Sequence, residues 1–268
     1  MPPSSPSFLP RIFFRGGLKG ALILLLIGFL ITPLLTPVVQ ARPLMAATPS
    51  ASISAPSSLF IGQDFTFTVT LDNAGEDTGY GPYLDVLFPV NGADGNAGAD
   101  TPDGIDFNSA SYLGTPLTAT ELTFPDADGA GSGTTGCVDH PYGVDSSGDP
   151  LQVCGTAGDK LVVLLMPFGS ITPGQPPLEV AVSASLSNLA DLDVPLTLKA
   201  RAGFQFGATP LNDWCCGDPT IVNPTSDDGS GWPSASVTPT LVTLAKSSNA
   251  PEEETATGPN YPREYTIT

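Results

Sequence analysis

The residues with the most reactive side chains are four cysteines, Cys137, Cys154, Cys215 and Cys216. In an exported protein an even number of cysteines normally forms disulfides. One scheme joins Cys137 to Cys154 and closes a loop of about 17 residues, worth roughly 3 kcal/mol. It leaves Cys215 and Cys216 to a strained bond between chain neighbours. A crossed scheme avoids that strain and ties two loops together. Zinc is not expected, because neither a Cys-x₂₋₄-Cys unit nor paired histidines occur.

Carboxylates gather in a Gly-rich segment between residues 91 and 106. Calcium binds six to eight oxygens from Asp, Asn and main-chain carbonyls on flexible loops, and the composition suits it. The segment lacks the third ligand and the terminal Glu of an EF-hand, so a solvated acidic loop is the preferred interpretation. Calcium is the alternative cofactor, and no other cofactor is predicted. Its ligands would be Asp94, Asn96, Asp100, Asp103 and Asp106.

Nucleophilic and acid–base catalysis find little support in the sequence. His140 is the only histidine, it precedes Pro141, and no Gly-x-Ser-x-Gly motif occurs. We therefore expect His140 to be an exposed polar residue. A glycosidase needs two carboxylates with separated pKa values, but among 27 acids some pair always lies at a suitable distance. The sequence thus predicts a protein that is not an enzyme, with an extracellular hydrolase as the least favoured alternative.

Four aromatic residues outside the predicted strand interiors could stack on a sugar ring. Aromatic side chains in the loops of a secreted protein can form such a platform, although they more often close the ends of a core. The candidates are Tyr80, Tyr83, Trp214 and Trp232.

The charge balance excludes nucleic acid as a partner. The chain has 268 residues, 9 Lys+Arg and 27 Asp+Glu, for a net charge of −18. A phosphate backbone is bound by basic residues, which are scarce here. Gly and Pro number 29 each, and such a share of residues that break regular structure argues against a coiled coil or a helical bundle.

The N-terminal segment has the pattern of an export signal. Arg11, Arg15 and Lys19 precede an apolar run from Ala21 to Ile31, and a small-x-small exit ends at Ala41. We expect residues 1–41 to be a signal peptide, with cleavage near residue 47 as an alternative. A retained transmembrane helix would be long enough, but Pro33 would break it. Cleavage leaves 6 Lys+Arg against 27 Asp+Glu, a net charge of −21.

The rest of the chain alternates apolar and polar residues with a period of two, as half-buried strands do. No window keeps a helical period, so antiparallel strands joined by turns predict a β-sandwich over residues 50–246. One short helical turn is expected at Ser187–Leu192, and Leu161–Met166 reads as a central strand. The other predicted strands are Phe65–Leu71, Tyr83–Phe88, Ser109–Leu113, Thr118–Phe124, Val180–Leu186, Leu196–Phe206, Ser234–Val237 and Thr240–Ala245.

Long Gly- and Asp-rich loops are expected at Asn91–Gly104 and Asp126–Pro150. Residues 247–260 are polar and read as a linker. Residues 261–268 then begin a new alternating strand. We interpret it as the first strand of a truncated following repeat, the alternative being a strand that completes the main sandwich.

Several sequence segments resemble the conserved-repeat domains of large secreted bacterial surface proteins, a family of unknown function. They include FTFTVTLDNAGEDTGYGPY from Phe65, GDKLVVLLMPFGSITPGQPP from Gly158 and LSNLADLDVPLTLKARAGFQFG from Leu186. The resemblance covers roughly residues 57–268. It implies an immunoglobulin-like β-sandwich at the N-terminal end of a repetitive surface protein. The family has no agreed catalytic residues, so none are carried over.

Together these observations predict an all-β, secreted, extracellular or cell-surface module with a structural or adhesive role. The alternative is a calcium-dependent carbohydrate-binding module. Expected partners are the following repeat domains of the same protein, and an extracellular polysaccharide or another surface protein. The protein would contact a membrane only through its N-terminal segment, and only if that segment is not cleaved.

Overall fold

The computed structural model describes residues 46–92, 102–126, 135–210, 219–242, 245–248 and 265–267. Within these ranges the chain is built of strands and turns, without a helix. No helix of this part is long and apolar enough to cross a membrane. The predicted signal peptide, residues 1–41, lies outside the described residues. The all-β class predicted from the alternation is confirmed.

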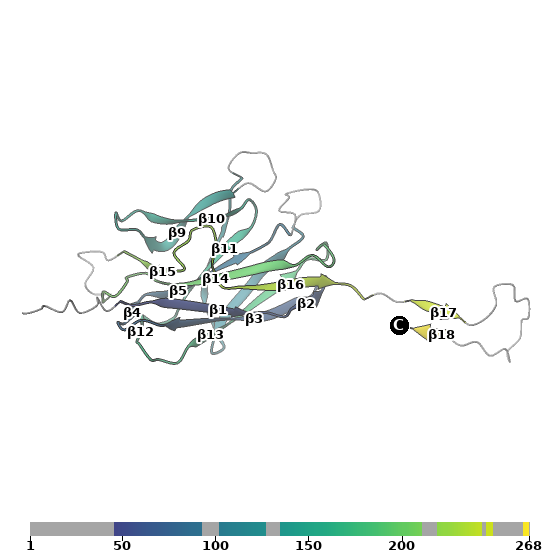
Figure 1. Ribbon diagram of the computed structural model, residues 1–268, viewed down its shortest axis with the longest axis horizontal. Coiled ribbons are helices and arrows are strands. Elements are labelled where there is room, and N and C mark those ends of the chain that lie inside the picture. The colour runs from purple at the N-terminus through teal and green to yellow at the C-terminus, as the bar shows by residue number, and fades with distance from the viewer. Residues whose placement is uncertain are drawn as a thin grey trace, which may run out of the picture. The chain divides into compact units, whose positions relative to one another are not determined.

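The described residues contain eighteen strands. Figure 1 shows how most of them are arranged. In chain order they are β1 (Pro49–Ser54), β2 (Ser58–Phe60), β3 (Asp64–Asn73), β4 (Gly79–Tyr80), β5 (Pro82–Phe88), β6 (Ile105–Tyr112), β7 (Thr115–Pro116), β8 (Thr118–Thr123), β9 (Thr135–Val144), β10 (Pro150–Thr156), β11 (Lys160–Leu165), β12 (Ser170–Ile171), β13 (Leu178–Leu186), β14 (Leu196–Phe204), β15 (Ile221–Asn223), β16 (Ser234–Thr240), β17 (Lys246–Ser248) and β18 (Tyr265–Ile267).

Two sheets form the sandwich. The first has the order β1-β3-β13-β6-β7, and the second has the order β2-β16-β14-β5-β11-β8 with β15 paired to β14. On β3 the side chains of Phe65, Phe67, Val69 and Leu71 are buried, whereas the threonines between them reach the surface. The apolar face of each sheet packs on that of the other, which is why the period of two is so regular in β3 and β13.

The main core lies between these two sheets. It takes Leu84, Val86 and Phe88 from β5, and their counterparts from β3, β13 and β14. The rings of Phe67 and Phe88 meet across the two sheets with centroids 6.0 Å apart. Such aromatic contacts add to the burial of apolar surface that holds the sandwich together.

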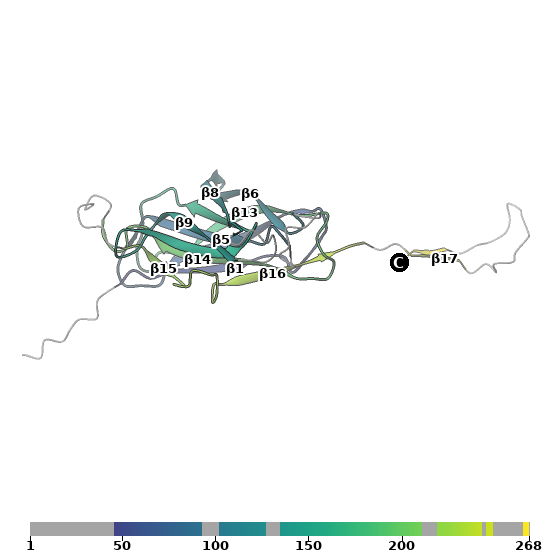
Figure 2. The same cartoon turned by 90° about the horizontal axis from the view of Figure 1, so that it is seen from above.

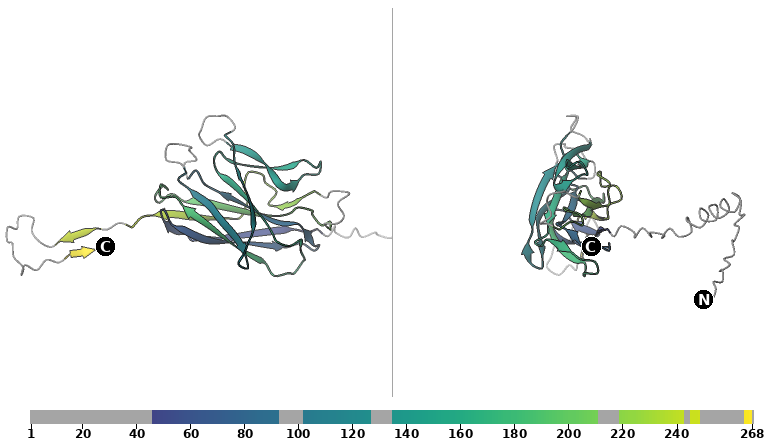
Figure 3. Two further views of the ribbon diagram at one scale, coloured as in Figure 1. Left: turned by 180° about the vertical axis from the view of Figure 1, so that it is seen from behind. Right: turned by 90° about the vertical axis from the view of Figure 1, so that its left-hand side faces the viewer.

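A third layer covers the outer face of the second sheet. The antiparallel hairpin β9–β10 lies beside β11, on the side of the molecule away from β1, β3 and β13 (Figures 1 and 3). Between the hairpin and the sheet lies a second apolar cluster, made of Tyr83, Phe124, Val153, Leu161, Val163 and Trp232. The expectation of a long loop over Asp126–Pro150 is therefore wrong, because Thr135–Val144 is a strand.

Three smaller expectations also need correction. Ser187–Leu192 forms turns rather than a helical turn. β14 ends at Phe204, and Phe206 beyond it is 37% exposed. β16 extends beyond the predicted strand Ser234–Val237, because the chain stays paired to β2 through Pro239 and Thr240. Part of the strand predicted at Thr240–Ala245 lies outside the described residues.

The C-terminal strands form a small sheet of their own. β17 pairs with β18 in antiparallel register, with Lys246 opposite Ile267. Most of the predicted linker over residues 247–260 lies outside the described residues.

Candidate functional site

The most unusual residue of the fold is Asp85, a carboxylate in the middle of a sheet. On β5, Leu84 and Val86 face the main core, so Asp85 between them faces the β9–β10 hairpin. Its neighbours across the sheet are Arg201 on β14 and Val163 on β11. Asp85 has no exposed surface. A buried charge is stable only when it is paired and hydrogen-bonded.

Two side chains satisfy the Asp85 carboxylate. His140 Nε2 lies 2.8 Å from one oxygen, and Arg201 Nε donates to the other at 2.7 Å. Burial alone would raise the pKa of Asp85, but its interactions with His140 and with Arg201 hold that pKa below the ordinary value. The carboxylate is therefore ionised, and the guanidinium opposite it balances the charge.

A bulge in β9 directs His140 into the sheet. The ladder with β10 shifts register after Gln152 pairs with Asp139, so the residues from His140 to Gly143 bulge out of it. Their freed amides are used locally, because Tyr142 N and Gly143 N donate to His140 Nδ1 at 3.2 and 2.6 Å. Nδ1 is thus an acceptor, and this hydrogen bonding assigns the proton to Nε2, which donates to Asp85.

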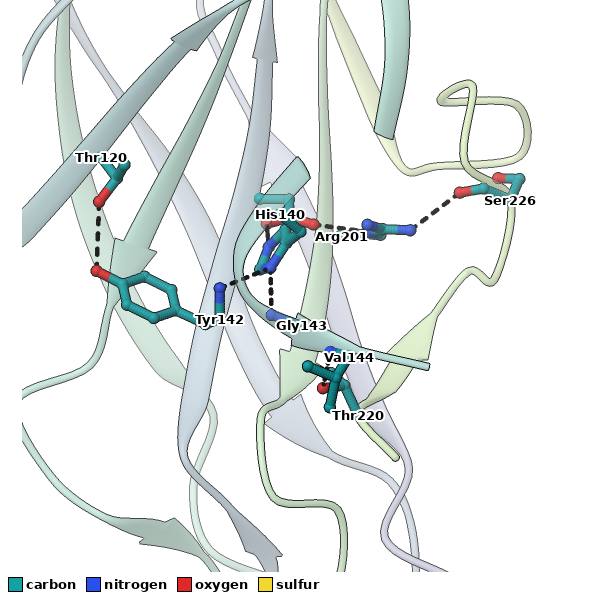
Figure 4. A network of polar contacts seen from close by, with 9 residues as sticks. Thr120, His140, Tyr142, Gly143, Val144, Arg201, Thr220 and Ser226 are labelled. Carbon is teal, nitrogen blue, oxygen red and sulfur yellow. Dashed lines mark hydrogen bonds and ion pairs between the residues drawn. The ribbon is translucent and has the colours of Figure 1, made fainter. Parts of the chain in front are cut away.

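Trp232 closes the other side of the cluster. The guanidinium of Arg201 lies over the Trp232 ring, 4.4 Å from its centroid, a favourable cation–π arrangement. Both residues also bind one carbonyl, since Arg201 Nη1 and Trp232 Nε1 each donate to Ser226 O at 3.0 Å. Asp85, His140, Arg201 and Trp232, called the buried charge cluster below, therefore join the hairpin, the sheet and the loop after β15. Figure 4 shows His140 and Arg201 of this cluster, with Ser226 beside Arg201.

Two further hydrogen bonds attach β9 to the sheet on either side of the cluster (Figure 4). Tyr142 Oη lies 3.3 Å from Thr120 Oγ1 on β8. Val144 N donates to Thr220 Oγ1 at 2.8 Å, and that hydroxyl donates onward to Gln205 O at 3.1 Å. These bonds hold β9 in place in addition to the buried charge cluster, and Cys154 N on β10 donates to Asp227 O at 2.7 Å.

The cluster corrects one sequence-based expectation, because His140, expected to be exposed, is 3% exposed. Arg201, on the face of β14 opposite the main core, is 2% exposed because the third layer covers that face. Asp85 was not singled out from the sequence, although a lone acid within the apolar strand YLDVLF is the signal that could have found it.

The predicted sugar platform is not assembled by the residues that can be seen. Trp232 is 4% exposed and Tyr83 is fully buried, so neither ring is available for stacking. Tyr80 is half-buried on β4, opposite Ser170. Trp214 lies outside the described residues.

The first disulfide scheme is confirmed for Cys137 and Cys154, which are bonded across β9 and β10. The bond lies on the outer side of the hairpin, since Cys137 is exposed while Val138 and His140 on either side of Asp139 turn inward. Cys215 and Cys216 lie outside the described residues.

The calcium prediction can be followed only in part, because Asp94, Asn96 and Asp100 lie outside the described residues. Asp103 is buried beside Gly92. Asp106 accepts a hydrogen bond from Lys160 Nζ at 2.8 Å and another from Phe107 N. Within the ranges that the structure describes, no three His, Cys, Asp or Glu residues are grouped to hold a metal ion.

Two open clefts flank the hairpin. One, of about 340 Å³, is lined by Gln152, Arg201, Thr225, Ser226 and other residues of the loop after β15. The other, of about 260 Å³, contains Asp159, Lys199 and Asp228 beside Cys154. In the second cleft the Asp159 carboxylate accepts a hydrogen bond from Asn91 N at 3.0 Å, so it stabilises a turn after β5.

Comparison with known proteins leaves the family open. No known protein family matches the chain, and no curated protein matches it. Among solved structures, a cohesin module from a family 33 glycoside hydrolase of Clostridium perfringens is 9% identical, with a TM-score of 0.36 over 72% of this chain and 98% of that one. The C-terminal fragment of the major pilin GBS80 of Streptococcus agalactiae is 9% identical, with a TM-score of 0.30 over 71% and 55%. AvmM, which catalyses macrocyclization in alchivemycin A biosynthesis, is 10% identical, with a TM-score of 0.35 over 74% and 91%.

The buried side chain of Tyr83 lies against the buried charge cluster. Its ring lies 4.7 Å from the His140 ring and over Gly203, where a Cβ would come within 2.1 Å of Tyr83 Cζ. Burial raises the pKa of Tyr83 well above its ordinary value. Among the described residues its hydroxyl has no hydrogen-bond partner, and an unsatisfied buried hydroxyl lowers stability.

We expect Tyr83→Phe to raise the free energy of unfolding by about 1 kcal/mol, because it removes a buried hydroxyl without creating a cavity. Urea unfolding followed by fluorescence measures the change. Tyr142→Phe is the matched control and should be destabilising, since the Tyr142 hydroxyl has Thr120 as a partner. A loss of stability in Tyr83→Phe would show that the hydroxyl is satisfied after all.

The buried carboxyl group of Asp159 is expected to lower the free energy of unfolding as the pH rises, whereas a carboxyl group with a lowered pKa has the opposite effect. Burial raises its pKa from 3.8 to about 6, and Asp103 adds to the rise. Between these pH values the folded protein keeps a proton that the unfolded chain has released. The contribution of Asp159 to the free energy of unfolding therefore falls as the pH rises from about 4 to about 6. The pKa of Asp85 is lowered in the folded protein, so Asp85 acts oppositely. Its contribution to the free energy of unfolding is lost only as the pH falls below 3.8, the ordinary pKa of an aspartate.

In urea titrations at pH 4, 5, 6 and 7 we expect Asp159→Asn to gain stability relative to the native protein as the pH rises. The amide oxygen can still accept from Asn91 N, so the turn is kept. Parallel stability curves for the two proteins would contradict the prediction.

Proposed function

We propose that the protein is a secreted, cell-surface β-sandwich module with a structural or adhesive role and without catalytic activity. The observation that carries this proposal is the position of its reactive groups. Asp85, His140 and Arg201 are 0–3% exposed and bonded to one another. Groups that could transfer protons are bonded to one another and hold a covering hairpin on a sheet, with almost no surface open to solvent.

The disulfide supports the proposed location. Cys137 and Cys154 are joined on the outer side of the hairpin, where a reducing compartment would keep them as thiols. The acidity of the chain fits the same setting, because like-charged surfaces stay soluble and repel one another.

A calcium-dependent carbohydrate-binding module has less support. The rings of Tyr83 and Trp232 are buried, and Asp106 is paired with Lys160. The partners that we propose are the following repeat domains of the same chain and an extracellular polysaccharide or surface protein.

Protease digestion of intact producing cells tests the proposal. Intact cells are treated with a protease that cannot enter them, and the protein and a cytosolic marker are followed by immunoblot. Free thiols are trapped by alkylation at lysis. We expect the protein to be digested while the marker survives, and peptides 137 and 154 to be recovered as one linked species. Protection from the protease, or alkylated Cys137 and Cys154, would contradict an extracellular module.

A further inference from the structure

The first and last residues of the sandwich lie at opposite ends of its strands. Ala46 O accepts a hydrogen bond from Glu76 N, just beyond the last residue of β3. From there β1 runs along the sandwich, and β2 ends beside the last residue of β16, with Phe60 opposite Thr240. Figures 1 and 2 show β1 beginning at one end and β16 ending at the other. A pull on the two flanking segments is therefore directed along the strands.

The first and last parts of the sandwich chain are joined directly to each other. β2 and β16 are parallel, with Ser58 opposite Thr238. Thr238 N donates to Ser57 O at 3.0 Å, and Ile61 N donates to Thr240 O at 3.1 Å. The Thr240 hydroxyl adds a bond to Leu59 O at 3.0 Å. We call this pairing the terminal clamp.

The direction of pulling decides how these bonds fail. Tension on the segments before Ala46 and after Val242 draws β2 and β16 in opposite directions along their common axis. Because the strands are parallel, the pulled end of β2 and the pulled end of β16 lie at opposite ends of the pair, so the two strands are sheared and the hydrogen bonds between them are loaded together. Strands separated from one end would instead break one bond at a time.

Side chains add resistance to sliding. Leu59 on β2 is 8% exposed and Val237 on β16 is fully buried, and both belong to the main core. β1 is likewise bonded lengthwise to β3 over six residue pairs, from Pro49 opposite Asn73 to Ser54 opposite Thr68. A sliding strand must therefore carry apolar side chains past closely packed neighbours.

From this arrangement we infer that the module transmits tension, and that the terminal clamp sets its resistance to unfolding under a pull between its two ends. The inference rests on the proposed function, because a surface module joined to further domains is pulled through its termini. The β9–β10 hairpin lies outside the clamp, so its disulfide should matter for equilibrium stability without affecting the unfolding force.

Single-molecule force spectroscopy on the full purified chain tests the inference, with handles at its two termini. Force-induced unfolding is governed by the unfolding rate and not by the equilibrium free energy. In a second geometry one handle is moved from the N-terminus to Leu189, which is 55% exposed. Its loop is bonded to β16 through Asp193 N and Pro239 O. This second pull peels β16 from its end, and we expect it to unfold the protein at about half the force or less.

Two changes then separate the clamp from general stability. Thr238→Pro removes the amide bonded to Ser57 and should lower the force in the terminal geometry. Reduction of the disulfide should leave that force unchanged and only lengthen the released chain by ~6 nm, the extended length of the bridged segment. Equal forces in both geometries would overturn the inference even if Thr238→Pro fails to fold, as would a lower force after reduction. These outcomes are independent of the protease experiment on cells, so the location and the mechanical role can fail separately.

Discussion

Replacement of Asp85 by alanine is expected to lower the free energy of unfolding by about 3–5 kcal/mol, because it leaves a buried charge without its partner. Arg201 is 2% exposed and would keep its hydrogen bond to Ser226 O and its contact with the Trp232 ring, neither of which supplies a negative charge. His140 would lose the acceptor of its Nε2 proton. Urea unfolding at pH 7, followed by Trp fluorescence and by circular dichroism, measures the loss.

Two further variants make this test specific. Asp85→Ala combined with Arg201→Met should recover part of the loss, because the uncompensated charge is then gone. Glu179→Ala removes an exposed acid from β13 and should change stability by no more than about 0.5 kcal/mol. A loss below 1 kcal/mol in the Asp85 single variant would mean that water or a rearranged hairpin reaches the cluster.

Removal of the disulfide is expected to cost about 3 kcal/mol, the loop-closure entropy of a crosslink between residues about 17 apart. The double variant Cys137→Ala with Cys154→Ala carries the test in urea unfolding. The hairpin contributes His140 and Val153 to the third layer, so we also expect faster amide exchange in β9 and β10 than in β3 and β13.

The double variant also supplies its own control. Reductant added to the native protein acts on every disulfide, whereas reductant added to the variant acts only on bonds formed by Cys215 and Cys216. If the double variant is as stable as the native protein, the apolar cluster and the buried charge cluster hold the hairpin without the disulfide between Cys137 and Cys154.

The sequence predicts the sandwich well wherever a strand has one face in the core and the other in water. β3 and β13 meet that condition, and their alternation places each strand within a few residues of its observed bounds. β11 is predicted for the opposite reason. Both of its faces are covered, by the main core and by the third layer, so the run from Leu161 is continuously apolar.

The hairpin and the cluster are harder to predict because nothing local specifies them. The segment that forms β9 is rich in Gly, Asp and Pro, and its order depends on Cys154 and on distant side chains. Asp85 and Arg201 are 116 residues apart in the chain. Alternation shows that Arg201 and Phe204 occupy opposite faces of β14, but it does not show that the polar face meets another layer of the same protein.

The pairing order of the strands also constrains when the chain can fold. β3 pairs with β13, β5 with β14, and β2 with β16, so each of these early strands has one partner that lies more than a hundred residues later in the chain. Such distant contacts form slowly, because the loop between them must close before any bond is gained. We proposed that the chain is exported. We therefore expect it to stay unfolded through most of its export and to complete the sandwich only after β16 has left the cell.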